Sequence, residues 1–204
     1  SPNENILTIA LITIHYLYNI TSGSLYITTG LLSTINTEEE LLAILAHEIA
    51  NQLTEKELPT HIFLQAGVGG FAAAIMAYFW EKYPDKNIKF IIVEPTLAPC
   101  LIGSANANKL TIFDIQKETM MAGLSCGEPS LLAWKILDEG TDHFMTITDD
   151  RVPDLMRLLA NGTDNDPSIE AGECSVSGLA ALIEVKNNDT MVKKLNLNDN
   201  SRVL

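Results

Sequence analysis

The feature that most constrains the fold is a glycine-rich loop between an apolar strand and an apolar helix. Thr60 to Gln65 has the composition of a strand, Ala66 to Gly70 contains three glycines, and Phe71 to Tyr83 is rich in alanine. A second strand candidate, Ile88 to Val93, follows the helix. Strands that alternate with helices at this spacing indicate βαβ units. The sequence therefore predicts an α/β fold with a mostly parallel sheet.

The loop itself predicts a phosphate-binding site. Gly67, Val68, Gly69, Gly70 and Phe71 form a G-x-G-G pattern that leads into the helix. Backbone N–H groups and the helix dipole hold a phosphate at such a terminus, and glycine lets the backbone approach it closely. The pattern is neither the Walker loop nor the complete dinucleotide fingerprint. Glycines that serve only a tight turn are therefore an alternative.

A helix is also expected ahead of the loop, from Asn36 or Thr37 to about Leu53. Glu40 stands three residues after Thr37, in the position of a capping box. The polar stretch from Gln52 to Pro59 then predicts a junction, which divides the chain into residues 1–56 and 57–204. Further helices are expected at Leu131 to Glu139, Val152 to Ala160 and Ser177 to Lys186.

Composition argues against several classes of protein. The net charge of -13 and the absence of a basic cluster argue against a nucleic-acid partner. Cys100, Cys126 and Cys174 lie far apart without a C-x-x-C pair, so neither a disulfide framework nor a structural zinc site is expected. Free thiols suggest a reducing compartment, and we expect a cytoplasmic protein.

The most apolar segment, Ile6 to Ile20, predicts a buried strand or helix and no membrane span. It has 15 residues, whereas a spanning helix needs roughly 20. It also lacks the basic start of a signal peptide.

The residues from Pro59 to Leu204 resemble the C-terminal half of the diaminopropionate ammonia-lyase family. These are pyridoxal-phosphate enzymes of fold type II, the tryptophan synthase β-like fold. The matching stretches are Pro59 to Gly69, Ile92 to Pro95, Met121 to Pro129 and Ala171 to Glu173. The resemblance implies that Gly67 to Phe71 cradle the cofactor phosphate, and that 121–129 and 172–178 line the same cleft. A small α+β segment would precede this parallel-sheet βαβ fragment.

The resemblance also implies a reaction, the elimination of ammonia from 2,3-diaminopropionate to give pyruvate. The cofactor ring serves as electron sink, and a lysine carries the Schiff base. This lysine and a catalytic aspartate are expected upstream of the glycine loop, and the partner of the ring nitrogen beyond Leu204. We therefore expect an incomplete active site. The lysines from Lys82 to Lys194 fit solvated positions, and Cys174 fits a buried small residue rather than a nucleophile.

His47, Glu48 and Asn51 form a variant of a zinc-protease motif. That motif needs histidine ligands at i and i+4 on a helix, with a glutamate that activates the bound water. Together with Leu25 to Leu32 and Glu40 to Ala46, these residues resemble the M48 metallopeptidase family over roughly residues 15–52. Asn51 is a poor zinc ligand, so His47 is a weak metal candidate and zinc is not expected. Glu48 is a catalytic candidate only if the peptidase hypothesis holds; a hydrogen-bonded pair in a packed helix is the alternative.

Three functions follow from these patterns. The first is a lyase-derived protein with a small amino-acid substrate, the second a metallopeptidase-like module, and the third a non-catalytic structural or chimeric protein. An incomplete parallel sheet should expose apolar edges such as Ile88 to Val93, which predicts self-association into a homo-oligomer.

Overall fold

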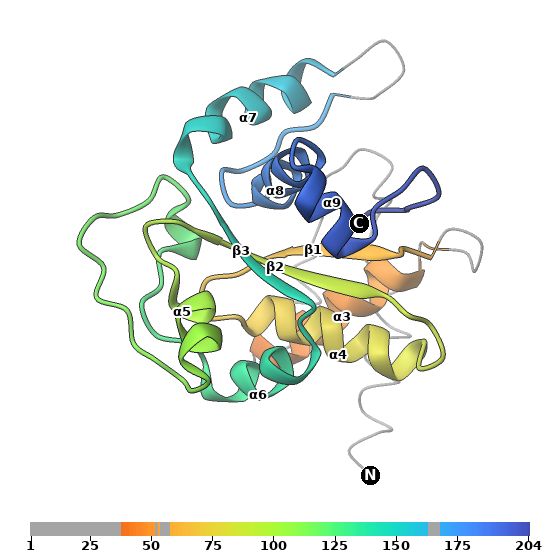
Figure 1. Cartoon of the computed structure of the whole chain (residues 1–204), viewed down its shortest axis with the longest axis horizontal. Coiled ribbons are helices and arrows are strands. Elements are labelled where there is room, and N and C mark those ends of the chain that lie inside the picture. Colours follow the sequence, from red (N-terminus) through yellow and green to blue (C-terminus); the bar gives the residue numbers. More distant parts are fainter. Residues whose placement is uncertain (1–37, 52, 54–57, 163–167) are drawn as a thin grey trace, which may run out of the picture.

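The computed structural model describes residues 38–51, 53, 58–162 and 168–204. The expected elements at Ile6 to Ile20 and at Leu25 to Thr29 lie outside these residues. Figure 1 shows the arrangement of the described elements. In chain order they are α3 (Glu38–Asn51), β1 (His61–Gln65), α4 (Gly70–Lys82), β2 (Lys89–Pro95), α5 (Cys100–Ala107), the 3₁₀ turn η2 (Ala122–Leu124), α6 (Leu131–Gly140), β3 (His143–Ile147), the 3₁₀ turn η3 (Asp149–Arg151), α7 (Val152–Asn161), α8 (Ser177–Lys186) and α9 (Asp189–Leu195).

The described strands form one parallel sheet in the order β1-β2-β3, so the predicted fold class is confirmed. Gln65 of β1 is in register with Val93 of β2, which is in register with Met145 of β3. The prediction that Ile88 to Val93 forms an exposed edge is wrong. β2 is the middle strand, and Phe90 to Val93 are at most 1% exposed. Strand order depends on the crossovers, which the local apolar pattern does not encode.

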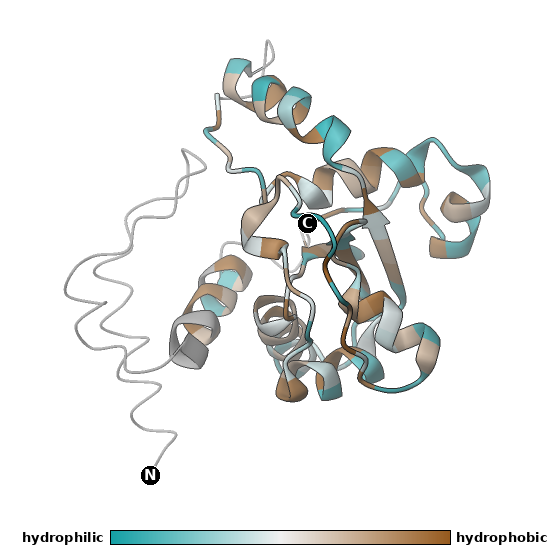
Figure 2. Cartoon of the chain, turned by 90° about the vertical axis from the view of Figure 1, so that its left-hand side faces the viewer, coloured by the Kyte–Doolittle hydropathy of each residue, from teal (hydrophilic) through white to brown (hydrophobic). Residues whose placement is uncertain are grey.

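Two helical layers cover the sheet, with α4 and α6 on one face and α8 and α9 on the other (Figure 1). Side chains alternate between the faces along each strand. Ile62 and Leu64 of β1 therefore join the core formed with α4 and α6, whereas Phe63 joins the core formed with α8. Figure 2 shows the strands coloured mostly as apolar, as expected for a sheet buried on both faces.

The helices predicted from the sequence are confirmed as α3, α4, α6, α7 and α8, with ends that differ by at most two residues. α3 packs on α4, since Ala46 and Ala50 are fully buried in the core that α4 shares. The sequence analysis did not predict α5, β3 or α9. β3 is the hardest of these to recognise, because four of its five residues are only half-buried.

The last residues return to the sheet beside β1. Val203 forms an isolated parallel bridge with His61. Phe63 N–H donates to the Leu204 carbonyl over 2.9 Å, and Leu204 N–H donates to the His61 carbonyl over 3.0 Å. Among the described residues, no helix is both long and apolar enough to cross a membrane.

Candidate phosphate-binding site

The glycine loop lies at the carboxyl edge of the sheet, between β1 and α4. Ala66 N–H still donates to the Val93 carbonyl over 2.9 Å, so the sheet pairing extends to the first residue of the loop. From there the chain turns into α4, which begins at Gly70. The structure therefore places Gly67, Val68, Gly69, Gly70 and Phe71, the predicted site residues, in one turn and the first turn of a helix.

Gly69 and Gly67 are required for different physical reasons. Gly69, the N-cap of α4, has φ 94° and ψ -4°, a left-handed conformation that favours glycine. A Cβ at this position would also lie 2.7 Å from Leu137 Cδ1. A Cβ on Gly67 would lie 2.8 Å from Cys126 Sγ and 3.2 Å from the Gly123 carbonyl oxygen. One glycine thus permits the turn, and the other permits the close approach of the segment that packs over the loop.

The three successive carbonyl groups of the loop are all held by donors. The Gly67 carbonyl accepts from the Cys100 thiol over 3.6 Å, the Val68 carbonyl from Ser130 N–H over 2.9 Å, and the Gly69 carbonyl from Ala73 N–H over 2.9 Å. Within the described part of the chain, no hydrogen bond uses the N–H groups of Gly67, Val68, Gly69 or Gly70. These N–H groups therefore remain for an acceptor that the described residues do not supply.

The N-terminus of α4 suits an anion as that acceptor. This helix has 13 residues, no side chain caps its N-terminus, and its first turn contains no acidic residue. The first N–H groups of a helix lack partners within the helix, and the dipole places partial positive charge there. A phosphate group meets both requirements.

Two further segments, which the resemblance assigns to the cofactor cleft, pack near the loop. The segment Met121 to Pro129 packs on Gly67 through Cys126 and Gly123. Cys174, from the segment 172–178, places its Sγ 3.2 Å from the position of a Cβ on Gly123. Cys174 is half-buried rather than buried, which corrects the expectation from sequence. Burial raises the pKa of its thiol, so Cys174 stays protonated at neutral pH and is a poor nucleophile.

Buried Glu94 is a site-supporting residue that the sequence analysis missed. Its carboxylate lies at the end of β2, is fully buried, and accepts from Leu101 N–H over 2.7 Å and Ile102 N–H over 2.8 Å. Burial raises the pKa of Glu94 to about 7. Burial, and after it the adjacent Glu94, raise the pKa of the Cys100 thiol to about 12. The only signal in the sequence was an acidic residue at the end of an otherwise apolar strand.

The described lysines lie away from the loop or in solvent. Lys89 is half-buried at the start of β2, the opposite end of the sheet from the loop, and the other described lysines are exposed. This agrees with the solvated positions expected from the sequence.

His47 forms part of a polar contact between α3 and α4. Its Nε2 lies 2.6 Å from Asn51 Nδ2 and its Nδ1 lies 2.7 Å from the Tyr78 hydroxyl. Asn51 Oδ1 accepts from Lys82 Nζ over 2.8 Å, which turns the Asn51 amide N–H toward His47. Both ring nitrogens of His47 are thus hydrogen-bonded. The described residues contain no group of three or more His, Cys, Asp or Glu that could hold a metal; the side chain of Glu48 lies outside the description.

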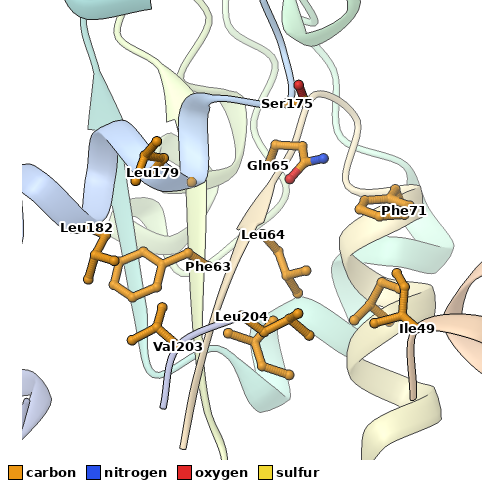
Figure 3. A pocket seen from close by; sticks show the side chains of 13 residues that line it. Ile49, Phe63, Leu64, Gln65, Phe71, Ser175, Leu179, Leu182, Val203 and Leu204 are labelled. Carbon is orange, nitrogen blue, oxygen red and sulfur yellow. The ribbon is translucent and has the colours of Figure 1, made fainter. Parts of the chain in front are cut away.

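An apolar cavity of about 410 Å³ lies along the outer edge of β1, away from β2. Figure 3 shows side chains from β1, α4, α8 and the last two residues turned toward it. Its lining is mostly aliphatic and aromatic, and Gln65 and Ser175 are its polar members. Phe71 of the glycine loop also lines it, so the cavity extends toward the phosphate-binding site.

Comparisons with known proteins identify relatives of this arrangement. The model of the family described as "Pyridoxal-phosphate dependent enzyme" matches residues 21–204. Diaminopropionate ammonia-lyase of Escherichia coli is 37% identical over 166 residues, which are 79% of this chain and 42% of the relative. A probable D-serine dehydratase of Colwellia psychrerythraea is 27% identical over 158 residues, 74% of this chain and 34% of the relative. The chain thus spans less than half the length of these relatives.

Solved structures agree with this match. The Escherichia coli diaminopropionate ammonia-lyase in complex with an aminoacrylate-PLP azomethine reaction intermediate has a TM-score of 0.72 and 36% identity, covering 81% of this chain and 43% of that one. Maize serine racemase has a TM-score of 0.64 at 19% identity, covering 83% of this chain and 49% of that one, and shows the fold alone.

Proposed function

Because this chain belongs to the family of pyridoxal-phosphate dependent enzymes, we propose that it forms the phosphate-binding part of an amino-acid lyase. The observation that carries the proposal is the N-terminus of α4, where the described residues provide neither a capping side chain nor an acceptor for the N–H groups of the glycine loop. The phosphate of pyridoxal phosphate would bind there. When bound, the cofactor supplies an electron sink for a negative charge that develops at the substrate Cα.

The protein's own residues would contribute binding and orientation. Gly67, Val68, Gly69, Gly70 and Phe71 would hold the phosphate through backbone N–H groups, assisted by the dipole of α4. The turn at Gly123 and the loop at Cys174 would form the wall beside it. The lysine that this chemistry requires would come from outside the described residues, since the described lysines lie in solvent or at the opposite end of the sheet.

The substrate we propose is 2,3-diaminopropionate, converted to pyruvate and ammonia. Diaminopropionate ammonia-lyase is 37% identical to this chain, whereas the probable D-serine dehydratase is 27% identical. D-Serine is therefore the alternative substrate to compare with 2,3-diaminopropionate in the test. We also propose that another segment or a partner chain completes the site. The chain would in addition self-associate.

The test is a titration of the purified chain with pyridoxal phosphate, followed by absorbance near the imine band. Borohydride reduction and mass spectrometry then identify any labelled lysine. Saturable binding that inorganic phosphate competes away supports the phosphate site, and stoichiometric labelling of one lysine would justify assays with 2,3-diaminopropionate and D-serine. Absence of saturable binding would contradict the proposed function.

A further inference from the structure

The hydrogen bonds to the carbonyl groups of the glycine loop identify residues that act on phosphate binding through the loop and not by contact with the phosphate. A phosphate needs donors, and a carbonyl oxygen turned toward it would repel it. The Gly69 carbonyl is held by Ala73 within α4 itself. The carbonyls of Gly67 and Val68 are instead held by groups from other elements, Cys100 and Ser130.

Cys100 is held in place by its own surroundings. It is the first residue of α5 and is fully buried. The two N–H groups that follow it, those of Leu101 and Ile102, bind the buried carboxylate of Glu94. The thiol therefore lies on an anchored helix terminus. Burial raises the pKa of the thiol to about 12, so it keeps its proton, which has the Gly67 carbonyl and the Glu94 carboxyl group as acceptors.

Ser130 is held in a comparable way. It is the N-cap of α6, with φ -62°, and its hydroxyl accepts from Ala133 N–H over 3.4 Å. Its own N–H donates to the Val68 carbonyl over 2.9 Å. Further along α6, Leu137 occupies the space beside Gly69. α6 and its N-cap thus support the loop at two successive residues, Val68 and Gly69.

We infer that Cys100 and Ser130 are positioning residues that set the preference of this site for phosphorylated over unphosphorylated ligands. The inference rests on the proposed function. Holding both carbonyls away from the ligand leaves the N–H groups of the loop oriented for an oxyanion. Loss of either donor lets one carbonyl turn, which weakens phosphate binding and leaves contacts to the rest of the ligand unchanged.

The first test compares Cys100→Ala with Cys100→Ser. The ratio of the dissociation constants for pyridoxal and pyridoxal phosphate is measured for each by fluorescence titration of the full chain. Removing one weak donor should lower this ratio about threefold in Cys100→Ala. Cys100→Ser keeps a donor and should retain most of the wild-type ratio. A role in packing alone would change both ligands equally.

The second test removes the other donor at a residue whose φ proline can adopt. Because Ser130 already has φ -62°, proline keeps this φ and deletes the N–H that binds the Val68 carbonyl, and its ring displaces that carbonyl. Ser130→Ala, the matched control, keeps the N–H and loses only the hydroxyl. We expect Ser130→Pro to lower the ratio about three- to tenfold relative to Ser130→Ala. This pair decides the question even if Cys100→Ala fails to fold.

The ratio measured for the wild type distinguishes failure of the proposed function from failure of the inference alone. A wild-type chain that binds both ligands equally would overturn the proposed function, and the inference with it. A wild-type chain that prefers pyridoxal phosphate, together with an unchanged ratio in Ser130→Pro, would overturn the inference alone. Competition by inorganic phosphate provides an independent readout. The variants that lower the ratio of dissociation constants should weaken the binding of inorganic phosphate by a similar factor.

Discussion

Trp80 occupies the space in which a side chain at Gly140 would lie. A Cβ on Gly140 would be 1.7 Å from Trp80 Cζ2, so the indole of α4 packs directly against the backbone of α6 here. Trp80 also packs edge-on against Phe90 of β2, with ring centroids 6.3 Å apart. Ala133, near the start of α6, lies 3.4 Å from the position of a Cβ on Gly69, so α6 supports α4 from the glycine loop to Trp80.

Gly140→Ala should therefore destabilise the fold. The added methyl must displace the Trp80 indole, which packs against α6 and against Phe90 of β2, and overpacking of this kind costs about 1–3 kcal/mol. Urea denaturation followed by tryptophan fluorescence measures the change. Gly103→Ala is the matched control, because a Cβ there meets nothing within 4 Å in the interior of α5. It should stabilise by about 0.5–1 kcal/mol, and equal losses in both variants would refute the packing argument.

Gly69→Ala should weaken the binding of pyridoxal phosphate at least tenfold. Alanine is strained at φ 94° and its methyl would meet Leu137 Cδ1, at a cost of about 1–3 kcal/mol. The loop should relieve this by leaving the conformation that directs its N–H groups outward. Isothermal titration calorimetry gives the affinity. Gly103→Ala, where a Cβ meets no described atom within 4 Å, should bind like the wild type.

The stability of the chain should depend on pH through Glu94. Burial raises the pKa of its carboxyl group from 4.5 to about 7 in the folded state. The folded protein then holds the proton more tightly than the unfolded chain. This contribution is fully present below pH 4.5 and is lost as the pH rises through 7. At about 1.4 kcal/mol per pKa unit the total is about 3 kcal/mol.

Glu94→Gln isolates this contribution from the other carboxyl groups. The variant should be less stable at acidic pH, because an amide N–H would face the N–H of Leu101 or Ile102. It cannot titrate, however, so the advantage of the wild type in unfolding free energy should shrink between pH 4.5 and 7. Parallel pH profiles for the two proteins would show that Glu94 titrates normally in the fold.

Zinc should not stabilise the protein through His47. Both ring nitrogens of His47 are hydrogen-bonded to Tyr78 and Asn51. A metal would have to break one of these contacts without gaining a complete ligand set among the described residues. Differential scanning fluorimetry with zinc and with a chelator should give the same melting temperature. A rise that zinc produces in the wild type and loses in His47→Ala would revive the metallopeptidase hypothesis.

The apolar cavity beside β1 should promote self-association. Val203 and Leu204 line it and remain 39% and 42% exposed. Multi-angle light scattering should show a mass that increases with concentration, because exposed apolar surface beside a strand edge favours association. Leu204→Glu should reduce this increase, whereas Leu158→Glu, on exposed α7 surface, should not. A monomer at all concentrations in the wild type would contradict the prediction.

Much of the local structure could be predicted from the sequence, because its causes are local. The strand at Thr60 to Gln65, the glycines after it and the alanine-rich helix specify a strand–loop–helix unit within a few residues. Elements without such a signal were missed. β3 is half-buried and follows Gly140 closely, and α5 lacks a capping side chain. The supposed edge at Ile88 to Val93 was misjudged, because neighbouring strands come from distant parts of the chain.

The sequence by itself determined the α/β class, the parallel sheet and the five residues of the glycine loop. Periodicity and glycine conformational freedom act over a few residues and can be read directly. Only the tertiary structure decided what supports that loop. Cys100, Cys126, Ser130 and Leu137 are 33 to 68 residues from the positions they contact. They meet the loop because the long connection from β2 to β3, which contains α5 and α6, passes beside the carboxyl edge of the sheet, and no local pattern encodes that meeting.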